Sequence, residues 1–275
     1  MKIIWIYASL LYSIFALLGP SIAHASEQYV FSAPPRGNAL EESQTYEPIA
    51  RYLTRVLGKP VAYKHPGDWL SYQTDMRAGA YDLVFDGPHF AAWRIKRIEH
   101  QPLVVLPGKL SFSVFTKSNE KRIKNINDLG GRTVCGMAPP NLATLSVYDA
   151  FRETPLRQPL IITVNSFQNG YQSVAQGKCA AGVMRDKLFG KLDKDKHMRV
   201  IHTTKGFANQ GFTAGPRITP QDRVRIIEAL LDPASFKETS PFQKRFNKGG
   251  KLLQRASLEE YEGLEHLLDS SWGFR

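Results

Sequence analysis

The feature of this sequence that most constrains its fold is an alternation of short apolar strand patterns with helix patterns, which occurs twice along the chain. Such alternation is typical of a parallel sheet covered by helices. The first unit predicts strands in QYVFSAPP, PVAYKH and YDLVF and helices in TYEPIARYLTRVLG and WLSYQTDMRAG. In the first helix, apolar residues recur at three- and four-residue spacing, and Gly58 supplies the stop.

The pattern restarts in the middle of the chain, after the extended apolar segments PLVVLP and KLSFSVFTK. Strands are predicted in GRTVCGM, LIITV and CAAGVMR, and helices in LATLSVYDAF and around NGYQSVAQGK. MRVIHTT and GFTAGP lead back to a tail with three predicted helices: TPQDRVRIIEALLD, SPFQKRFN and SLEEYEGLEHLLD. Thr219-Pro220 and the capping box of Ser257 and Glu260 are typical helix starts. The tail should pack on the first unit, because we expect no sheet of its own.

We therefore predict an α/β fold of two doubly wound α/β lobes, joined by crossing strands near residues 104–115 and 200–214. Strand ends of both lobes would then surround one cleft, and closure of such a cleft traps ligands. The predicted parts are a signal peptide (1–25), the first part of lobe 1 (26–107), lobe 2 (108–205), and a return to lobe 1 with C-terminal helices (206–275).

The first 25 residues have the pattern of a secretory signal. Lys2 precedes the apolar run IIWIYASLLYSIFALLG, and Ala23-His24-Ala25 forms an A-x-A cleavage site. An uncleaved anchor is the alternative. No later stretch approaches the roughly 20 apolar residues needed to span a bilayer, so we expect a soluble exported protein.

Charge and cysteine content restrict the ligand and the covalent structure. The net charge of +11 favours anionic ligands, but the basic residues form no nucleic-acid motif, so no nucleic-acid partner is expected. The histidines are scattered, so no metal or other cofactor is expected. Cys135 and Cys179 fall on strands that neighbour each other in the usual doubly wound order, which favours a disulfide in an oxidising compartment. Two buried free thiols are the alternative.

The segment DLVFDGPHF places Asp86 and His89 directly after a buried strand pattern. The carboxyl end of a parallel strand is where open α/β sheets bind ligands. The alternative is an ordinary turn at Gly87-Pro88 in which Asp86 caps the next helix.

Four segments carry a resemblance to a known family: Tyr46-Glu47-Pro48-Ile49 with RYLTRVLGKPV, then MRAGAYDLVFDGPHFAAW, INDLGGRTV and VAQGKCAAGVM. In their order and spacing the chain resembles, over residues 28–235, the periplasmic phosphate, phosphite and phosphonate-type solute-binding proteins of ABC transporters. The resemblance implies a type II periplasmic binding fold, a periplasmic location, a small and anionic ligand, and an ABC permease as partner.

The chain departs from the family at two places that bear on the ligand. It has APPNLATL where phosphonate-binding members carry a Ser/Thr-rich turn, although the amides at this helix start, the Asn141 side chain and the Thr144 hydroxyl could still hold an anion. An ordinary capped helix start is the alternative. Asp86 replaces an apolar residue, so it contacts a cationic or hydroxyl-bearing part of the ligand or pairs with a neighbour such as His89.

Three further residues complete the predicted site. The resemblance carries an aromatic wall to Tyr46, which alternatively packs beside Pro48. Ser111 lies in the first crossing segment, and Arg185 follows the strand AAGVM, where its planar fork of donors could grip an oxyanion. An exposed arginine at a strand end is the alternative for Arg185.

Two other functions are compatible with such a fold. One is a ligand sensor that signals to a membrane receptor such as a histidine kinase, which the sequence does not separate from transport. The other is an exported enzyme, against which the chain has no G-x-S-x-G elbow, no zinc motif and no credible Cys-His pair. Asp86 with His89 is a weak acid/base candidate, so we expect no enzyme.

Overall fold

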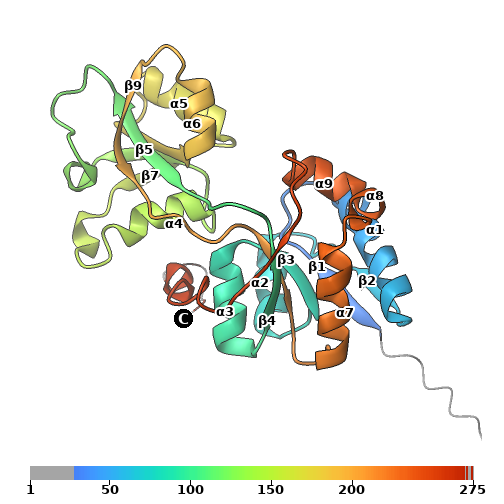
Figure 1. Ribbon diagram of the computed structural model, residues 1–275. Coiled ribbons are helices and arrows are strands. Elements are labelled where there is room, and N and C mark those ends of the chain that lie inside the picture. Colours follow the sequence, from blue (N-terminus) through green and yellow to red (C-terminus); the bar gives the residue numbers. More distant parts are fainter. Residues whose placement is uncertain (1–27, 270, 272–273, 275) are drawn as a thin grey trace, which may run out of the picture.

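A computed structural model describes residues 28–269, 271 and 274 of the chain. Figure 1 shows two bodies of α/β structure connected by two chain segments. The signal peptide predicted for residues 1–25 lies outside the described residues. Within the described part of the chain, no helix combines the length and the apolar character that a membrane span requires.

The first sheet has six strands in the order β11-β4-β10-β3-β1-β2. Its strands are β1 (Tyr29–Ser32), β2 (Val61–Tyr63), β3 (Leu83–Asp86), β4 (Gln101–Val105), β10 (Gly211–Ala214) and β11 (Gln254–Arg255). The helices of this body are α1 (Ala39–Leu57), α2 (Trp69–Arg77), α3 (Pro88–Ile98), α7 (Pro220–Leu231), α8 (Ser235–Glu238) and α9 (Ser240–Phe246).

The second sheet has five strands in the order β7-β6-β8-β5-β9. Its strands are β5 (Phe112–Lys117), β6 (Thr133–Gly136), β7 (Leu160–Thr163), β8 (Ala181–Arg185) and β9 (Met198–Thr203). The helical elements of this body are α4 (Leu142–Asp149), α5 (Phe167–Ala175), α6 (Asp186–Leu192) and the 3₁₀ turns η1 (Ile126–Leu129) and η2 (Pro155–Arg157).

The predicted α/β class with two sheets is confirmed, but both sheets are mixed rather than wholly parallel. The chain crosses from β4 to β5 and returns from β9 to β10, and Leu110 and Phe207 form an antiparallel bridge between the two crossing segments. β10 is antiparallel to β3 and β4, and β5 is antiparallel to β8 and β9. The reason is geometric, since a strand that arrives from the other body starts at the cleft, where its neighbours end.

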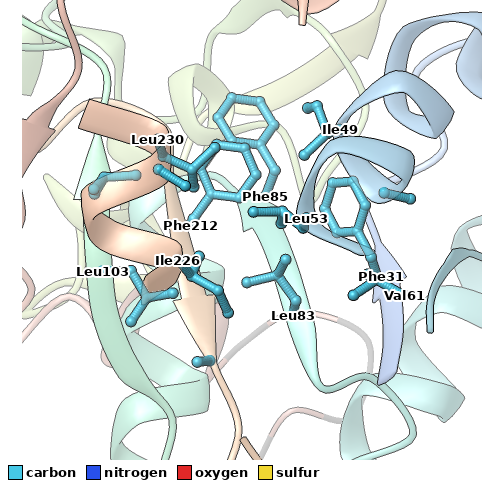
Figure 2. Close-up of a cluster of buried hydrophobic side chains, with 14 of the residues drawn as sticks. Phe31, Ile49, Leu53, Val61, Leu83, Phe85, Leu103, Phe212, Ile226 and Leu230 are labelled. Atoms are coloured by element: carbon cyan, nitrogen blue, oxygen red, sulfur yellow. The ribbon is translucent and has the colours of Figure 1, made fainter. Parts of the chain in front are cut away.

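The core of the first body lies between its sheet and the helices α1, α7 and α9. Figure 2 shows Ile49 and Leu53 of α1 close to Phe31 of β1. Helix α1 begins at Ala39, six residues before the predicted segment, because the Asn38 side chain caps it by accepting from the Glu41 N–H at 3.0 Å. The helix continues through Pro48 and ends at Gly58, whose φ of 67° is the left-handed conformation that glycine adopts without strain.

The C-terminal tail differs from its prediction at two points. Strand β11 extends the first sheet beside β4, so the tail does contribute to a sheet. The predicted helix in SLEEYEGLEHLLD is a series of turns followed by the short 3₁₀ turn η3 (Glu265–Leu268). Gly263 accounts for the interruption, because its φ of 74° is left-handed. Turn η3 contacts both α3 and α4, so the tail lies against both bodies.

The structure joins Cys135 and Cys179 in a disulfide, with their α-carbons 5.7 Å apart. Cys135 lies on β6, and Cys179 lies two residues before β8, which runs parallel beside β6. The bond therefore connects β6 to the segment that leads into its neighbour β8, and Cys179 lies just before the strand on which it was predicted.

Candidate ligand-binding site

A cavity of about 550 Å³ lies where the carboxyl ends of strands from both sheets meet. Its walls come from the loop after β1, the start of α2, the β3–α3 turn, β5, the loops after β6 and β7, the end of β8, and both crossing segments. The lining residues are Pro35, Arg36, Trp69, Gly87, Pro88, His89, Phe90, Leu110, Phe112, Met137, Ala138, Pro139, Pro140, Asn141, Leu142, Thr163, Val164, Asn165, Phe167, Arg185 and Gln210. The segments GPHF (87–90), from the first body, and APPNL (138–142), from the second, thus both line one cavity.

Residues 86–89, at the end of β3, form the first lip of the cavity, and residues 137–141, after β6, form the second lip. His89 connects the two lips by a hydrogen bond. Gly87 is the N-cap of α3, and a side chain there would approach the His89 ring to about 3.0 Å. His89 Nε2 lies 3.0 Å from the carbonyl oxygen of Pro140 and, because a carbonyl only accepts, it carries the proton of this hydrogen bond. Burial lowers the pKa of His89 to about 3, with a smaller lowering by the charge of Arg36. His89 is therefore neutral at neutral pH.

Asp86 lies behind the cavity wall and pairs with Arg94 rather than with His89. Its Oδ2 accepts from Arg94 Nε at 3.0 Å and from the Tyr72 hydroxyl at 2.7 Å, and Arg94 also donates to the Tyr72 hydroxyl. Asp86 and Arg94 are both 0% exposed. Of the two alternatives for Asp86, pairing with a neighbour is therefore observed, with Arg94 rather than His89, and Asp86 is not among the residues that line the cavity. The arginine on α3 compensates the charge that would otherwise repel an oxyanion.

Besides Asp86, three more of the predicted site residues lie outside the cavity lining. Tyr46 is buried in the first core, where its hydroxyl accepts a 3.3 Å hydrogen bond from the lining residue Arg36. The Thr144 hydroxyl donates to the Met137 carbonyl, which fixes the loop before α4. Ser111 uses its carbonyl to accept from the Asp186 N–H at 3.0 Å, at the start of α6.

Asn141 lines the cavity as the N-cap of α4. Its Oδ1 accepts from the Ala143 N–H at 3.1 Å, so this oxygen serves the helix rather than the cavity. The first amides of an α-helix have no intrahelical acceptor, and the helix dipole is positive at this end. The start of α4 therefore favours a negative charge nearby, and anion binding at this helix start stays a prediction.

Two arginines line the cavity from opposite bodies. Arg185, a predicted site residue, ends β8 of the second sheet, and Arg36 follows β1 of the first sheet. Among the described residues neither forms an ion pair with a carboxylate. Arg36 lies over the rings of Phe85 and Phe246, which hold its guanidinium in place. Arg36 was not identified from the sequence. The pattern that could have identified it is a cationic residue in the loop after the first strand.

The remaining walls are largely apolar and aromatic. Trp69 and Phe90 come from the first body, and Phe112 and Phe167 come from the second. No aspartate or glutamate is among the described residues that line the cavity. Within the described residues, no group of three or more His, Cys, Asp and Glu side chains could hold a metal ion. The arrangement can therefore hold an oxyanion by arginine and amide donors beside an apolar surface.

Comparison with known proteins identifies the family of this chain. Residues 31–270 match the family model described as the phosphonate ABC transporter periplasmic substrate-binding protein. The chain is 22% identical to a phosphate-import protein, PhnD, of Mycolicibacterium smegmatis, over 77% of this chain and 74% of that protein.

Solved structures show the same fold. A Xanthomonas citri protein, XAC2383, in its ATP-bound form has a TM-score of 0.69 and 15% identity, covering 90% of this chain and 100% of that one. PhnD1 of Prochlorococcus marinus, in complex with methylphosphonate, has a TM-score of 0.65 and 13% identity, covering 89% and 98%. The family match spans most of the sequence, including both walls of the cavity. This chain therefore belongs to the family of periplasmic substrate-binding proteins of phosphonate ABC transporters.

Proposed function

We propose that the protein captures a phosphonate or a phosphate-like oxyanion in this cavity and delivers it to the permease of an ABC transporter. One observation carries the proposal: the cavity is lined by one arginine from each body, Arg36 and Arg185, and by the start of α4. Arginine presents a planar fork of donors that matches the oxygens of a phosphoryl group. The names of two relatives, a phosphate-import protein and a protein in complex with methylphosphonate, support this ligand class.

The proposed mechanism is closure of two lobes around the ligand. Lobe 1 would comprise residues 26–107 with the returning segment 206–275, and lobe 2 residues 108–205, joined at the Leu110–Phe207 bridge. A ligand that both arginines contact binds the closed form more tightly, and only this difference in affinity shifts the protein toward closure. The hydrogen bond from His89 to Pro140 adds an interlobe contact that does not depend on the ligand.

Delivery to a permease is favoured over the other two functions considered. The family is one of transport proteins rather than enzymes, and no feature of the cavity specifically supports signalling to a receptor such as a histidine kinase. The predicted signal peptide of residues 1–25 would take the protein to the periplasm, where its family acts.

Titration calorimetry of the purified protein with methylphosphonate, phosphate and phosphite tests the proposal. We expect saturable binding of at least one of them, and we expect Arg185→Met to weaken it roughly 10- to 100-fold, because charge-assisted hydrogen bonds contribute about 1.5–3 kcal/mol. Arg97→Met is the matched control, since it removes the same charge from the exposed last turn of α3. Absence of binding by folded protein, or equal losses in both variants, would contradict the proposed site.

A further inference from the structure

The cavity is larger than an inorganic oxyanion requires. Its volume of about 550 Å³ falls within the range of pockets that hold organic ligands. Five heavy atoms of a phosphate group, each given the roughly 30 Å³ that a water molecule takes in the liquid, fill about 150 Å³. The two lips touch through His89 and Pro140, so the cavity is closed where the lips meet. The volume that a phosphate group leaves unfilled therefore lies behind this contact.

The wall of this remaining space is suited to an apolar group. Trp69 and Phe90 lie 6.2 Å apart between ring centroids with an interplanar angle of 20°, so they form a stacked pair on the first-body wall. Phe112 and Phe167 supply aromatic surface from the second body. Aromatic walls bury alkyl and aryl groups favourably, whereas the attraction of an ammonium to a ring face recovers only a small part of the hydration free energy that the ammonium loses.

Among the described residues that line the cavity, no carboxylate is present to compensate a positive charge on the ligand. The charged residues of this lining are Arg36 and Arg185. Asp86, the acidic residue of the β3 lip, is 0% exposed and already accepts from Arg94 and Tyr72. A ligand ammonium entering this cavity would lose its hydration and could find uncharged acceptors, such as the unpartnered Gln210 Oε1 and His89 Nδ1 atoms, but no carboxylate among the described lining residues. Part of its hydration free energy would therefore not be recovered.

We infer that the preferred ligand is an organophosphorus oxyanion whose substituent is an apolar alkyl or aryl group, and that aminoalkyl phosphonates are discriminated against. This inference rests on the proposed function, because it assumes that the phosphoryl group binds near the arginines. The discrimination arises from the apolar wall and from the absence of a carboxylate among the described lining residues. Phosphonates and phosphate monoesters share this chemistry, since both carry a terminal phosphoryl group.

A matched pair of ligands tests the inference. Propylphosphonate and 2-aminoethylphosphonate have the same number of heavy atoms and differ by a methyl in place of an ammonium group. In titration calorimetry we expect propylphosphonate to bind at least tenfold more tightly. We also expect the affinity to rise about fourfold for each methylene added from methylphosphonate to propylphosphonate, as burial of such a group predicts. Phenylphosphonate against phenyl phosphate distinguishes a phosphonate from a phosphate ester.

The outcomes separate this inference from the proposed function. If 2-aminoethylphosphonate binds as tightly as propylphosphonate, or if methylphosphonate does, the inferred substituent is wrong while the proposed function stands. If none of these compounds nor phosphate binds to folded protein, the proposed function fails and the inference with it.

Variants of the wall provide an independent readout. Phe167→Ala and Trp69→Ala are expected to abolish most of the advantage of propylphosphonate over methylphosphonate while changing methylphosphonate affinity less than about threefold. Arg185→Met should weaken both ligands by the same factor. Two wall variants are used because Phe167 also packs against the second core, and circular dichroism will show whether each variant is folded. Equal weakening of both phosphonates in both folded wall variants would overturn the inference.

Discussion

The two lips of the cavity, residues 86–89 after β3 and residues 137–141 after β6, differ in what holds them in place. The first lip follows a fully buried ion pair between Asp86 and Arg94 and ends in a neutral histidine. The second lip is held by hydrogen bonds to its own backbone, from the Thr144 hydroxyl and to the Asn141 side chain. The comparison indicates that one lip depends on charge compensation in the interior, whereas the other depends on ordinary helix capping.

The largest expected effect comes from removing the acidic partner of the buried ion pair. Asp86→Ala leaves the Arg94 guanidinium without its carboxylate at 0% exposure, which should lower the free energy of unfolding by roughly 3–5 kcal/mol. Urea denaturation at neutral pH measures this loss.

A double variant sharpens the same test. Replacing both charges by apolar residues, as in Asp86→Leu with Arg94→Met, should be much less destabilising than Asp86→Ala, because no uncompensated charge remains. A loss below about 1 kcal/mol in Asp86→Ala would mean that the first lip does not depend on charge compensation.

A smaller effect should appear in the pH dependence of the free energy of unfolding, through His89 of the first lip. His89 has a pKa of about 3 in the folded protein and an ordinary value near 6.5 when unfolded, so the unfolded chain binds more protons between these values. The free energy of unfolding should therefore fall as the pH is lowered through this window, by about 1.5 kcal/mol between pH 6.5 and pH 5 from His89 alone.

The measurement is a comparison of His89→Gln with the unmodified protein at both pH values. The variant should lose about 1.5 kcal/mol less stability on acidification, since glutamine does not titrate. His100, whose pKa burial lowers to about 2, contributes equally to both proteins and cancels. His197→Gln, at an exposed position, is the control that should behave like the unmodified protein. An identical pH dependence of all three would show that His89 is not buried in its neutral form.

Much of this arrangement could be predicted from local sequence patterns. The strand and helix alternation predicts the two α/β bodies, and the strand-end rule places DGPHF and APPNL at one cleft. Arg185 could be identified because it lies at the end of a predicted strand. Local patterns predict these features because strands, helices and strand ends are determined largely by residues that are close in the sequence.

The missed features depend on residues that are distant in sequence or on a small backbone detail. Arg36 becomes a cavity residue only when the two sheets come together. The partner of Asp86 is Arg94, which lies on the buried side of α3. A charged residue is not expected at such a position, so the sequence pattern did not suggest this pair. Tyr46 is buried because the helix that contains it starts earlier than predicted and presents this face to the core. Gly263, with its left-handed backbone, interrupts a segment in which periodicity alone predicts one helix and in which the structure has turns.

The smallest expected effects concern the second lip, where stability and binding can be separated at Asn141. Asn141→Ala removes the oxygen that caps α4 and should cost about 1 kcal/mol of unfolding free energy. Asn141→Asp keeps a capping oxygen and should remain within about 0.5 kcal/mol of the unmodified protein. It also adds a negative charge to the cavity lining, so affinity for methylphosphonate should fall at least tenfold.

Urea denaturation and titration calorimetry on the same two variants give both quantities. If Asn141→Asp bound methylphosphonate normally, the oxyanion would not lie near the start of α4, and the second lip would serve only to shape the cavity.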